Sequence, residues 1–239
     1  MPRPNSPPPA LAVLVNGPSS SGKSTLCEAL QLQLTALAEG DPDSAFARVA
    51  FDDVVLLMAD NLYPISFARL QGRTPDGLVS LSPYDGRAGW EYIDQSEAEG
   101  IHGGSPRVRL VLNPHGRRLL RGVHLSWSGH LALGTSLVID HFLQEKEWVD
   151  ETLAAVHDSG ASLFSVGVFC SLPELERRES ARADGGVEGR PLGLARRSDE
   201  LCHATGLAYD ITVNSSEQTT TESVDAILAG LRTAGHIPL

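Results

Sequence analysis

The chain has 239 residues, of which 41% are hydrophobic and 21% are charged, as in soluble globular proteins. This length allows one α/β domain with a sizeable core and room for an insertion. The net charge of −11 argues against nucleic acid or an anionic membrane as the main partner, and it favours a small-molecule substrate.

Targeting and redox signals are absent from the sequence. No apolar run approaches the roughly 20 residues that cross a bilayer, and the N-terminus lacks the pattern of a signal peptide. The three cysteines, Cys27, Cys170 and Cys202, form no C-x-x-C pair, which argues against a disulfide framework or a structural zinc site. We therefore expect a cytoplasmic protein.

The first elements in chain order are a leader, a strand and a helix. Residues 1–10 contain five prolines and predict a disordered leader. The aliphatic run 11–16 predicts a buried strand, and leucines on one face of residues 22–38 predict a helix. Residues 11–239 are then expected to form a single domain.

The segment between this strand and this helix matches G-x-x-x-x-G-K-[ST], the phosphate-binding loop or Walker A motif. Its residues are Gly17, Pro18, Ser19, Ser20, Ser21, Gly22, Lys23, Ser24 and Thr25. The glycines allow a tight turn that directs backbone N–H groups at phosphate oxygens. The lysine would reach the β- and γ-phosphates, and the Ser24 hydroxyl would bind Mg²⁺. The motif predicts binding of a nucleoside triphosphate.

A second short strand, at about 48–51, ends in Asp52 and Asp53. Ligands of parallel α/β sheets bind at the carboxyl ends of the strands, so Asp52 is a candidate general base for an incoming hydroxyl. The alternative is that Asp52 or Asp53 caps a helix starting near Val54. Spacing alone does not decide between these two roles.

The pattern then breaks down between about 61 and 114, where glycines, prolines and aromatic residues occur without sustained periodicity. A loop of this length inside a compact domain is usually functional or disordered. Its aromatic residues favour an insertion that covers the acceptor substrate, because disordered segments are poor in them.

The rest of the chain alternates between helices and strands. Helices are expected from residue 116 to about 131 and at 146–158, 172–183, 191–203 and 223–233; strands are expected at 136–142, 163–170 and 211–215. Five strands alternating with helices predict a three-layer α/β sandwich with a parallel sheet. Asp140, at the end of the 136–142 strand, is a candidate Walker B residue that would help to hold Mg²⁺, or else it caps the next turn.

Six of the seventeen arginines lie between residues 177 and 197, beside glycines 185, 186 and 189. Arginines that close over a transferring phosphoryl group stabilise its charge, and glycines would supply a hinge. Interleaved glutamates favour an ordinary solvated helix as the alternative. Arg182 and Arg190, on either side of the glycines, are the best candidates for a catalytic lid, which we place at about 174–197.

With these features in place, the chain resembles the chloramphenicol phosphotransferase family of P-loop kinases. The matching segments are 16–24, Phe51-Asp52, 137–141, the R-E-S-A-R run at 178–182, Gly189-Arg190, His203 and Tyr209-Asp210. The resemblance implies an adenylate-kinase-like sheet, MgATP as donor and phosphorylation of a hydroxyl on an antibiotic. It also implies Asp52 as general base, and Arg182 and Arg190 as lid residues beside the catalytic Lys23. We assign Arg178 to nucleotide binding.

The predicted function is therefore transfer of the γ-phosphate to chloramphenicol or another natural-product antibiotic, including a nucleoside antibiotic, which would confer resistance. The alternatives are a metabolic kinase of a nucleoside or sugar, and a regulatory nucleotide-binding NTPase. The signatures of GTPase switches and of transporter ATPases are missing, but the sequence does not distinguish ATP from GTP. A homodimer is compatible with the family, although no interface signal is visible.

Overall fold

The computed structural model describes residues 9–37, 44–57, 89–96, 106–184 and 191–238. Its centre is a five-stranded sheet in the order β2-β5-β1-β6-β7, and all of its strand pairs are parallel. The strands are β1 (Leu11–Asn16), β2 (Ala47–Ala50), β5 (Leu137–His141), β6 (Ser162–Phe169) and β7 (Ile211–Asn214). The predicted parallel sheet is confirmed.

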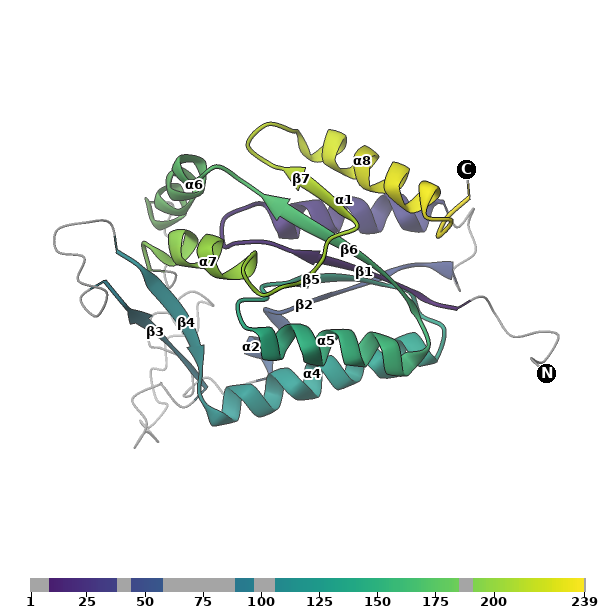
Figure 1. Ribbon diagram of the computed structural model, residues 1–239, viewed down its shortest axis with the longest axis horizontal. Helices are drawn as coiled ribbons and strands as arrows, with labels where there is room; N and C mark the ends of the chain where they lie inside the picture. Colours follow the sequence, from purple (N-terminus) through teal and green to yellow (C-terminus); the bar gives the residue numbers. More distant parts are fainter. Residues whose placement is uncertain (1–8, 38–43, 58–88, 97–105, 185–190, 239) are drawn as a thin grey trace, which may run out of the picture.

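Alternation along β1 explains the layers. Leu11, Val13 and Val15 face one apolar cluster, which includes side chains of α1 (Lys23–Ala36) and α8 (Thr220–Thr233). Ala12 and Leu14 face the other cluster, with α4 (Pro114–Ala132) and α5 (Lys146–Ser159). Because both faces of the strand are covered, it consists of aliphatic residues throughout. Figure 1 shows the sheet between these two helix pairs.

Three further helices lie near the carboxyl ends of the strands. They are α2 (Asp53–Leu56), α6 (Leu172–Asp184) and α7 (Leu194–Cys202). The glycine-rich break predicted between the last two falls on residues 185–190, outside the described residues. The predicted leader lies outside them too as far as residue 8, whereas Ala10 is buried and its carbonyl accepts a hydrogen bond from the Ser162 N–H at 2.9 Å.

A two-stranded antiparallel hairpin stands beside the main sheet, at the left of Figure 1. Its strands are β3 (Trp90–Asp94) and β4 (Val108–Leu112), and Tyr92 pairs with Leu110. The sequence analysis expected no regular element between 61 and 114, so this hairpin corrects it. The parts 61–88 and 97–105 of that insertion lie outside the described residues.

Specific contacts hold the hairpin against the domain. The Gln144 side chain donates a hydrogen bond to the Leu110 carbonyl at 2.5 Å, and Arg109 pairs with Glu145 at 2.9 Å. On the other side, the Val108 N–H donates to the Gly193 carbonyl at 3.2 Å. These contacts fix the hairpin at the sheet edge where the strands end.

No helix of the described residues is long and apolar enough to cross a membrane.

Candidate active site

The loop between β1 and α1 has the shape that a phosphate-binding loop requires. A Cβ atom on Gly17 would lie 2.5 Å from the Val168 carbonyl oxygen, so only glycine fits there. Gly22 has a φ of +84° and Ser20 a φ of +66°, both in the left-handed region. Alternating right- and left-handed residues turn successive N–H groups toward one centre, which makes an anion-binding concavity.

Polar side chains inside this loop are already positioned. Lys23 is 8% exposed and its ammonium donates to the Pro18 carbonyl at 2.8 Å. The hydroxyl oxygen of Ser20 is buried and has no hydrogen-bond partner among the described residues. A buried hydroxyl without a partner is costly unless a ligand supplies one, and phosphate oxygens would do so. The loop therefore fits a polyphosphate.

Arg178, which we assigned to nucleotide binding, reaches the loop from α6. Its guanidinium lies within hydrogen-bond distance of the Ser20 and Ser21 carbonyls, at 3.5 and 3.3 Å, and donates to the Ser215 carbonyl at 2.8 Å. Glu174 accepts its Nε–H at 2.7 Å. Arg178 therefore joins the phosphate loop to the segment after β7 through the backbone carbonyls of both.

Ser24 and Asp140 meet because β5 lies beside β1, where Asp140 pairs in register with Val15. The Ser24 hydroxyl donates to the Asp140 carboxylate at 2.7 Å, and Asp140 is only 6% exposed. A hydroxyl and a carboxylate side by side are oxygen ligands of the kind that Mg²⁺ prefers. The pair therefore fits the predicted metal site next to the phosphate loop.

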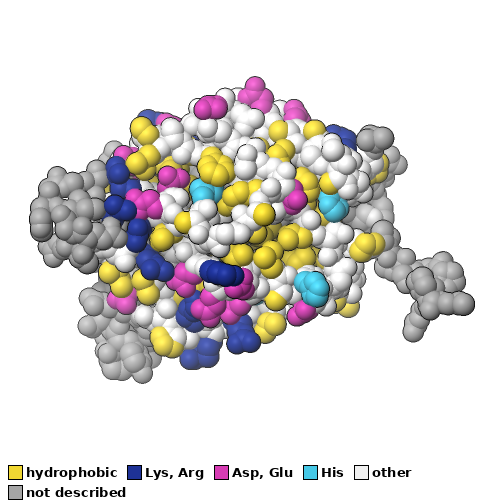
Figure 2. Space-filling model, in the orientation of Figure 1, with side chains coloured by type: hydrophobic (Ala, Val, Ile, Leu, Met, Phe, Trp, Pro, Cys, Tyr) yellow, Lys and Arg dark blue, Asp and Glu magenta, His cyan; other side chains and the backbone are white. Residues whose placement is uncertain are grey.

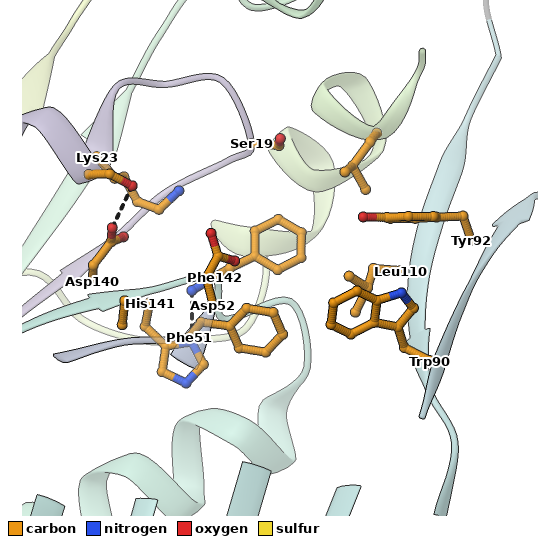
Figure 3. A pocket seen from close by; sticks show the side chains of 13 residues that line it. Ser19, Lys23, Phe51, Asp52, Trp90, Tyr92, Leu110, Asp140, His141 and Phe142 are labelled. Carbon is orange, nitrogen blue, oxygen red and sulfur yellow. Dashed lines mark hydrogen bonds between the residues drawn. The ribbon is translucent and has the colours of Figure 1, made fainter. Parts of the chain in front are cut away.

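Asp52 lies on the turn after β2, one strand further from β1. The Phe51 N–H donates to the Asp140 carbonyl at 2.8 Å, which fixes this turn against the end of β5. Asp53, by contrast, accepts the Ala50 N–H at 2.7 Å and is turned back toward its own strand. Asp52 is exposed and lines the same cleft as Lys23 and Asp140. Figure 3 shows it between Lys23 and the aromatic side chains of the hairpin.

The cleft has a charged end and an aromatic end. It encloses about 630 Å³ of empty space, including its open mouth. Lys23, Ser24 and Asp140 line one end, and the opposite wall is apolar. That wall includes Trp90, Tyr92 and Leu110 of the hairpin and Leu194, while Phe51 and Phe142 lie beside Asp52, between the two ends. In Figure 3 the Tyr92 ring points its hydroxyl into the cleft.

A chain of buried imidazoles runs beneath the cleft, which the sequence analysis did not foresee. His141 lines the cleft; its Nδ1 accepts the Phe142 N–H at 2.7 Å, so its other nitrogen carries the proton. That nitrogen lies 2.9 Å from Nε2 of His124, whose Nδ1 lies 3.1 Å from the Glu151 carboxylate. Burial lowers the pKa of His141 well below its usual value and, with Arg117, lowers the pKa of His124 to about 4. Both rings are therefore neutral near pH 7.

The C-terminal motif that carried part of the family resemblance supports the loop from below. Asn16 donates to the Tyr209 hydroxyl at 2.8 Å and accepts the Leu143 N–H at 2.9 Å. His203 lies 3.0 Å from the same hydroxyl, and Asp210 accepts the Ser165 N–H at 2.7 Å. These residues connect the end of β1 with the segments after β5 and before β7.

The structure describes only one of the two predicted lid arginines. Arg182 is an exposed residue on α6, and Arg190 lies outside the described residues, so the lid assignment stays a prediction. Other arginines of the cluster pair with glutamates, as the alternative reading expected. The pairs are Arg177 and Arg178 with Glu174, Arg196 with Glu176, and Arg197 with Glu200. Figure 2 shows basic and acidic side chains interleaved at this end of the molecule.

The parallel sheet in this order, with a phosphate loop after its central strand, defines the architecture of a P-loop kinase. The family model described as "Chloramphenicol phosphotransferase-like protein" matches residues 10–232. The chain therefore belongs to this family, and it is a nucleotide-dependent small-molecule kinase. A search of curated proteins finds no match to the sequence.

Solved structures support the same fold. An APS kinase from Mycobacterium tuberculosis, in complex with AMPPNP and APS, is similar with a TM-score of 0.54 and 17% identity, over 95% of this chain and 99% of that one. A gluconokinase from Sinorhizobium meliloti is similar with a TM-score of 0.50 and 18% identity, over 95% and 93%. At these identities the likeness concerns the fold alone.

Proposed function

We propose that the protein transfers the γ-phosphate of ATP to a hydroxyl group of a neutral natural-product antibiotic such as chloramphenicol, and so confers resistance. The observation that carries this proposal is the place of Asp52 between the phosphate end and the aromatic end of one cleft. Such an arrangement lets one carboxylate face an alcohol beside the terminal phosphate. The family match adds to it. Activity in the cytoplasm, where MgATP is abundant, agrees with three free cysteines.

In the proposed reaction Asp52 accepts the proton of the acceptor hydroxyl, and the oxygen of that hydroxyl forms a bond to the γ-phosphorus. The bond from that phosphorus to the β–γ bridging oxygen breaks, and ADP leaves. Lys23 and the N–H groups of the loop offset the charge on the phosphoryl oxygens. Arg182 and Arg190 are proposed to add to this from the lid.

Ser24 and Asp140 are the residues that would hold Mg²⁺. When bound, the ion neutralises charge on the phosphates and helps to orient them. Ser24 would ligate the ion directly with its hydroxyl oxygen, and Asp140 would hold it directly or through a water molecule.

The aromatic wall favours a neutral acceptor with a flat or apolar body. Among the described residues that line the cleft, the only ionic side chains are Lys23 and Asp140 at the phosphate end and Asp52 between the two ends. An anionic acceptor would need a cation at the opposite end, and a sugar would need several hydrogen-bonding groups. The hairpin residues that line the cleft carry two polar side-chain groups, the Tyr92 hydroxyl and the Trp90 indole N–H.

The second candidate is a metabolic kinase of a nucleoside or sugar, which has the same chemistry. The similar solved structures include kinases named for metabolic acceptors, and this keeps the alternative open. A nucleoside would also stack on the aromatic wall.

The test is to incubate the purified protein with MgATP and a panel of alcohols, and to detect a phosphorylated product by mass spectrometry. The panel contains chloramphenicol, nucleoside antibiotics, common nucleosides and sugars. We expect transfer to a neutral aromatic alcohol, and protection of a susceptible strain that expresses the protein. Transfer to a common nucleoside or sugar alone favours the metabolic kinase. Nucleotide binding without any phosphorylated product favours a regulatory NTPase.

A further inference from the structure

Helix α7 lies between the phosphate loop and the β3–β4 hairpin, as Figure 1 shows. It therefore stands between the two ends of the cleft, and Leu194 in its first turn contributes to the lining. Its contacts on each side are specific hydrogen bonds.

On the loop side, the contact is made by Ser198. Its hydroxyl oxygen accepts the Ser19 N–H at 2.9 Å, and its proton is donated to the Ala195 carbonyl at 2.9 Å. Ser198 is 1% exposed and Ser19 is 6% exposed, so water does not replace either bond. Because the proton is committed to its own helix, the hydroxyl presents a lone pair to the loop. Ser198 thus fixes the distance between the backbone of the phosphate loop at Ser19 and α7.

On the hairpin side, three contacts join α7 and its N-cap Gly193 to β4 and to the residues that follow β3 and precede β4. The Val108 N–H donates to the Gly193 carbonyl at 3.2 Å, and Arg197 donates to the Gln95 side chain at 2.9 Å. Arg107 pairs with Glu200. Gly193 has a φ of +91°, and a Cβ atom there would lie 2.2 Å from the Pro106 carbonyl oxygen, so the backbones are in close contact.

The helix between these two sets of contacts is itself firmly held. Glu179 of α6 accepts the N–H groups of Gly193 and Ala195, both at 2.7 Å, and so caps its N-terminus. At its other end the Cys202 carbonyl accepts the Asn16 side chain at 3.0 Å. Both ends of α7 are therefore anchored to the domain, and the helix gives the phosphate loop and the hairpin one common, well-ordered support.

We propose that Ser198 is a positioning residue that couples the two substrate sites: nucleotide bound in the phosphate loop orders the hairpin through α7. The physical basis is that phosphate draws the loop N–H groups to one centre, while Ser198 ties the loop backbone to the helix. The proposal rests on the proposed function for the statement that the hairpin walls the acceptor site. Coupling between sites in proteins typically amounts to about 5- to 150-fold in affinity.

The experiment is amide hydrogen exchange on the full chain, with and without saturating Mg²⁺ and the non-hydrolysable analogue AMPPNP. The reporters are the Val108 amide, bonded to Gly193, and the Gln95 amide, which donates to the Arg107 carbonyl. No acceptor is needed. In the wild type we expect nucleotide to slow exchange at both amides by about fivefold or more.

Two variants break the connection at its two ends. Ser198→Ala removes the acceptor of the Ser19 N–H, and Gln95→Ala removes the side chain that Arg197 contacts on the hairpin surface. We expect both to bind AMPPNP at saturation. Ser198→Ala should lose most of the slowing at the two reporters, and Gln95→Ala, which keeps the Val108–Gly193 bond and the Arg107–Glu200 pair, should lose part of it at the Gln95 amide. The matched control is Arg196→Ala, on the same helix, whose partner Glu176 belongs to α6; it should keep the slowing.

The outcomes separate this proposal from the function on which it rests. Calorimetry reports nucleotide binding independently of exchange. Binding to the wild type without slower exchange at the hairpin overturns the coupling alone, whereas absence of binding overturns the proposed function as well. Slowing of exchange that persists unchanged in both Ser198→Ala and Gln95→Ala also overturns the coupling. If Ser198→Ala does not fold, Gln95→Ala decides alone.

Discussion

The two ends of the cleft are built in different ways. The phosphate end comes from one contiguous motif between β1 and α1, completed by a single residue of the neighbouring strand, Asp140. The aromatic end is assembled from the hairpin and the start of α7, and Phe51 and Phe142 extend its apolar surface toward Asp52. The first end requires fixed residue types because phosphate and Mg²⁺ chemistry is the same in every such kinase. The second end requires only shape and apolarity, so it can vary with the acceptor.

The largest effect is expected at the phosphate end. Lys23→Ala removes the ammonium that we propose to face the phosphates, and we expect the rate of phosphoryl transfer to fall by about a hundredfold or more. The other lysine in the chain supplies the control. Lys146 is exposed and pairs with Asp150 on α5, so Lys146→Ala should leave the rate unchanged. Equal loss in both variants, measured as steady-state rates, would contradict the assignment of Lys23.

The imidazole chain beneath both ends predicts how stability depends on pH. The pKa of His124 is about 4 in the folded protein, below its ordinary value of 6.5. The unfolded chain therefore binds more protons between these values, and stability is lost as the pH falls from about 6.5 to 4. For His124 this amounts to about 3 kcal/mol at most, and the lowered pKa of His141 adds to it.

Thermal unfolding of the wild type and of His124→Gln between pH 7.5 and 4.5 measures this dependence. The variant keeps a hydrogen-bonding side chain without a titrating group, so its stability should fall less steeply in this window. Glu174, whose pKa is lowered to about 2 by hydrogen bonds from Arg177 and Arg178, loses its contribution only at lower pH. Parallel curves for wild type and variant would show that His124 does not titrate as expected.

At the aromatic end, Tyr92→Ala should raise the KM for the acceptor by about tenfold while the KM for ATP changes little. The side chain lines the cleft, and its loss removes both a ring face and a hydroxyl. Its neighbour Ile93 is 40% exposed and points to the other face of the hairpin, so Ile93→Ala is the matched control. A rise in the KM for ATP instead would place Tyr92 at the phosphate end of the cleft and contradict its assignment to the acceptor.

The smallest effect, on the KM for ATP, is expected from substituting one of two adjacent arginines of α6. Arg178→Ala removes hydrogen bonds to the phosphate loop and to Ser215, and the KM for ATP should rise by severalfold, up to about tenfold. Arg177 is largely exposed and pairs with Glu174, so Arg177→Ala should leave both KM values unchanged. Equal effects of the two substitutions would argue that the cluster acts through its net charge.

The sequence predicted the five strands and the phosphate end because each depends on local pattern. Buried parallel strands are continuous aliphatic runs, and Asp140 follows one of them. The hairpin was missed because each of its strands has only five residues, and the connection 95–107 between them is too long for a tight-turn signal. The approach of His124 to His141 brings together a helix and a strand 17 residues apart, which no local spacing indicates.

Other functional features could not be read because their residue types are common. Ser198 is one serine among many, and only the fold brings it to the Ser19 N–H. Asp52 and Asp53 were equal candidates for capping in the sequence. The structure separates them, since Asp53 turns back to Ala50 and Asp52 lines the cleft.

The central claim is that Asp52 removes the proton of an alcohol beside a bound nucleotide, and Asp52→Asn tests it most directly. The variant keeps the shape of the side chain and loses its basicity, while the phosphate loop is untouched. We predict that the rate of phosphoryl transfer falls by about 10²- to 10⁴-fold and that the affinity for AMPPNP, measured by calorimetry, stays close to that of the wild type. Transfer at the wild-type rate in Asp52→Asn would contradict the account.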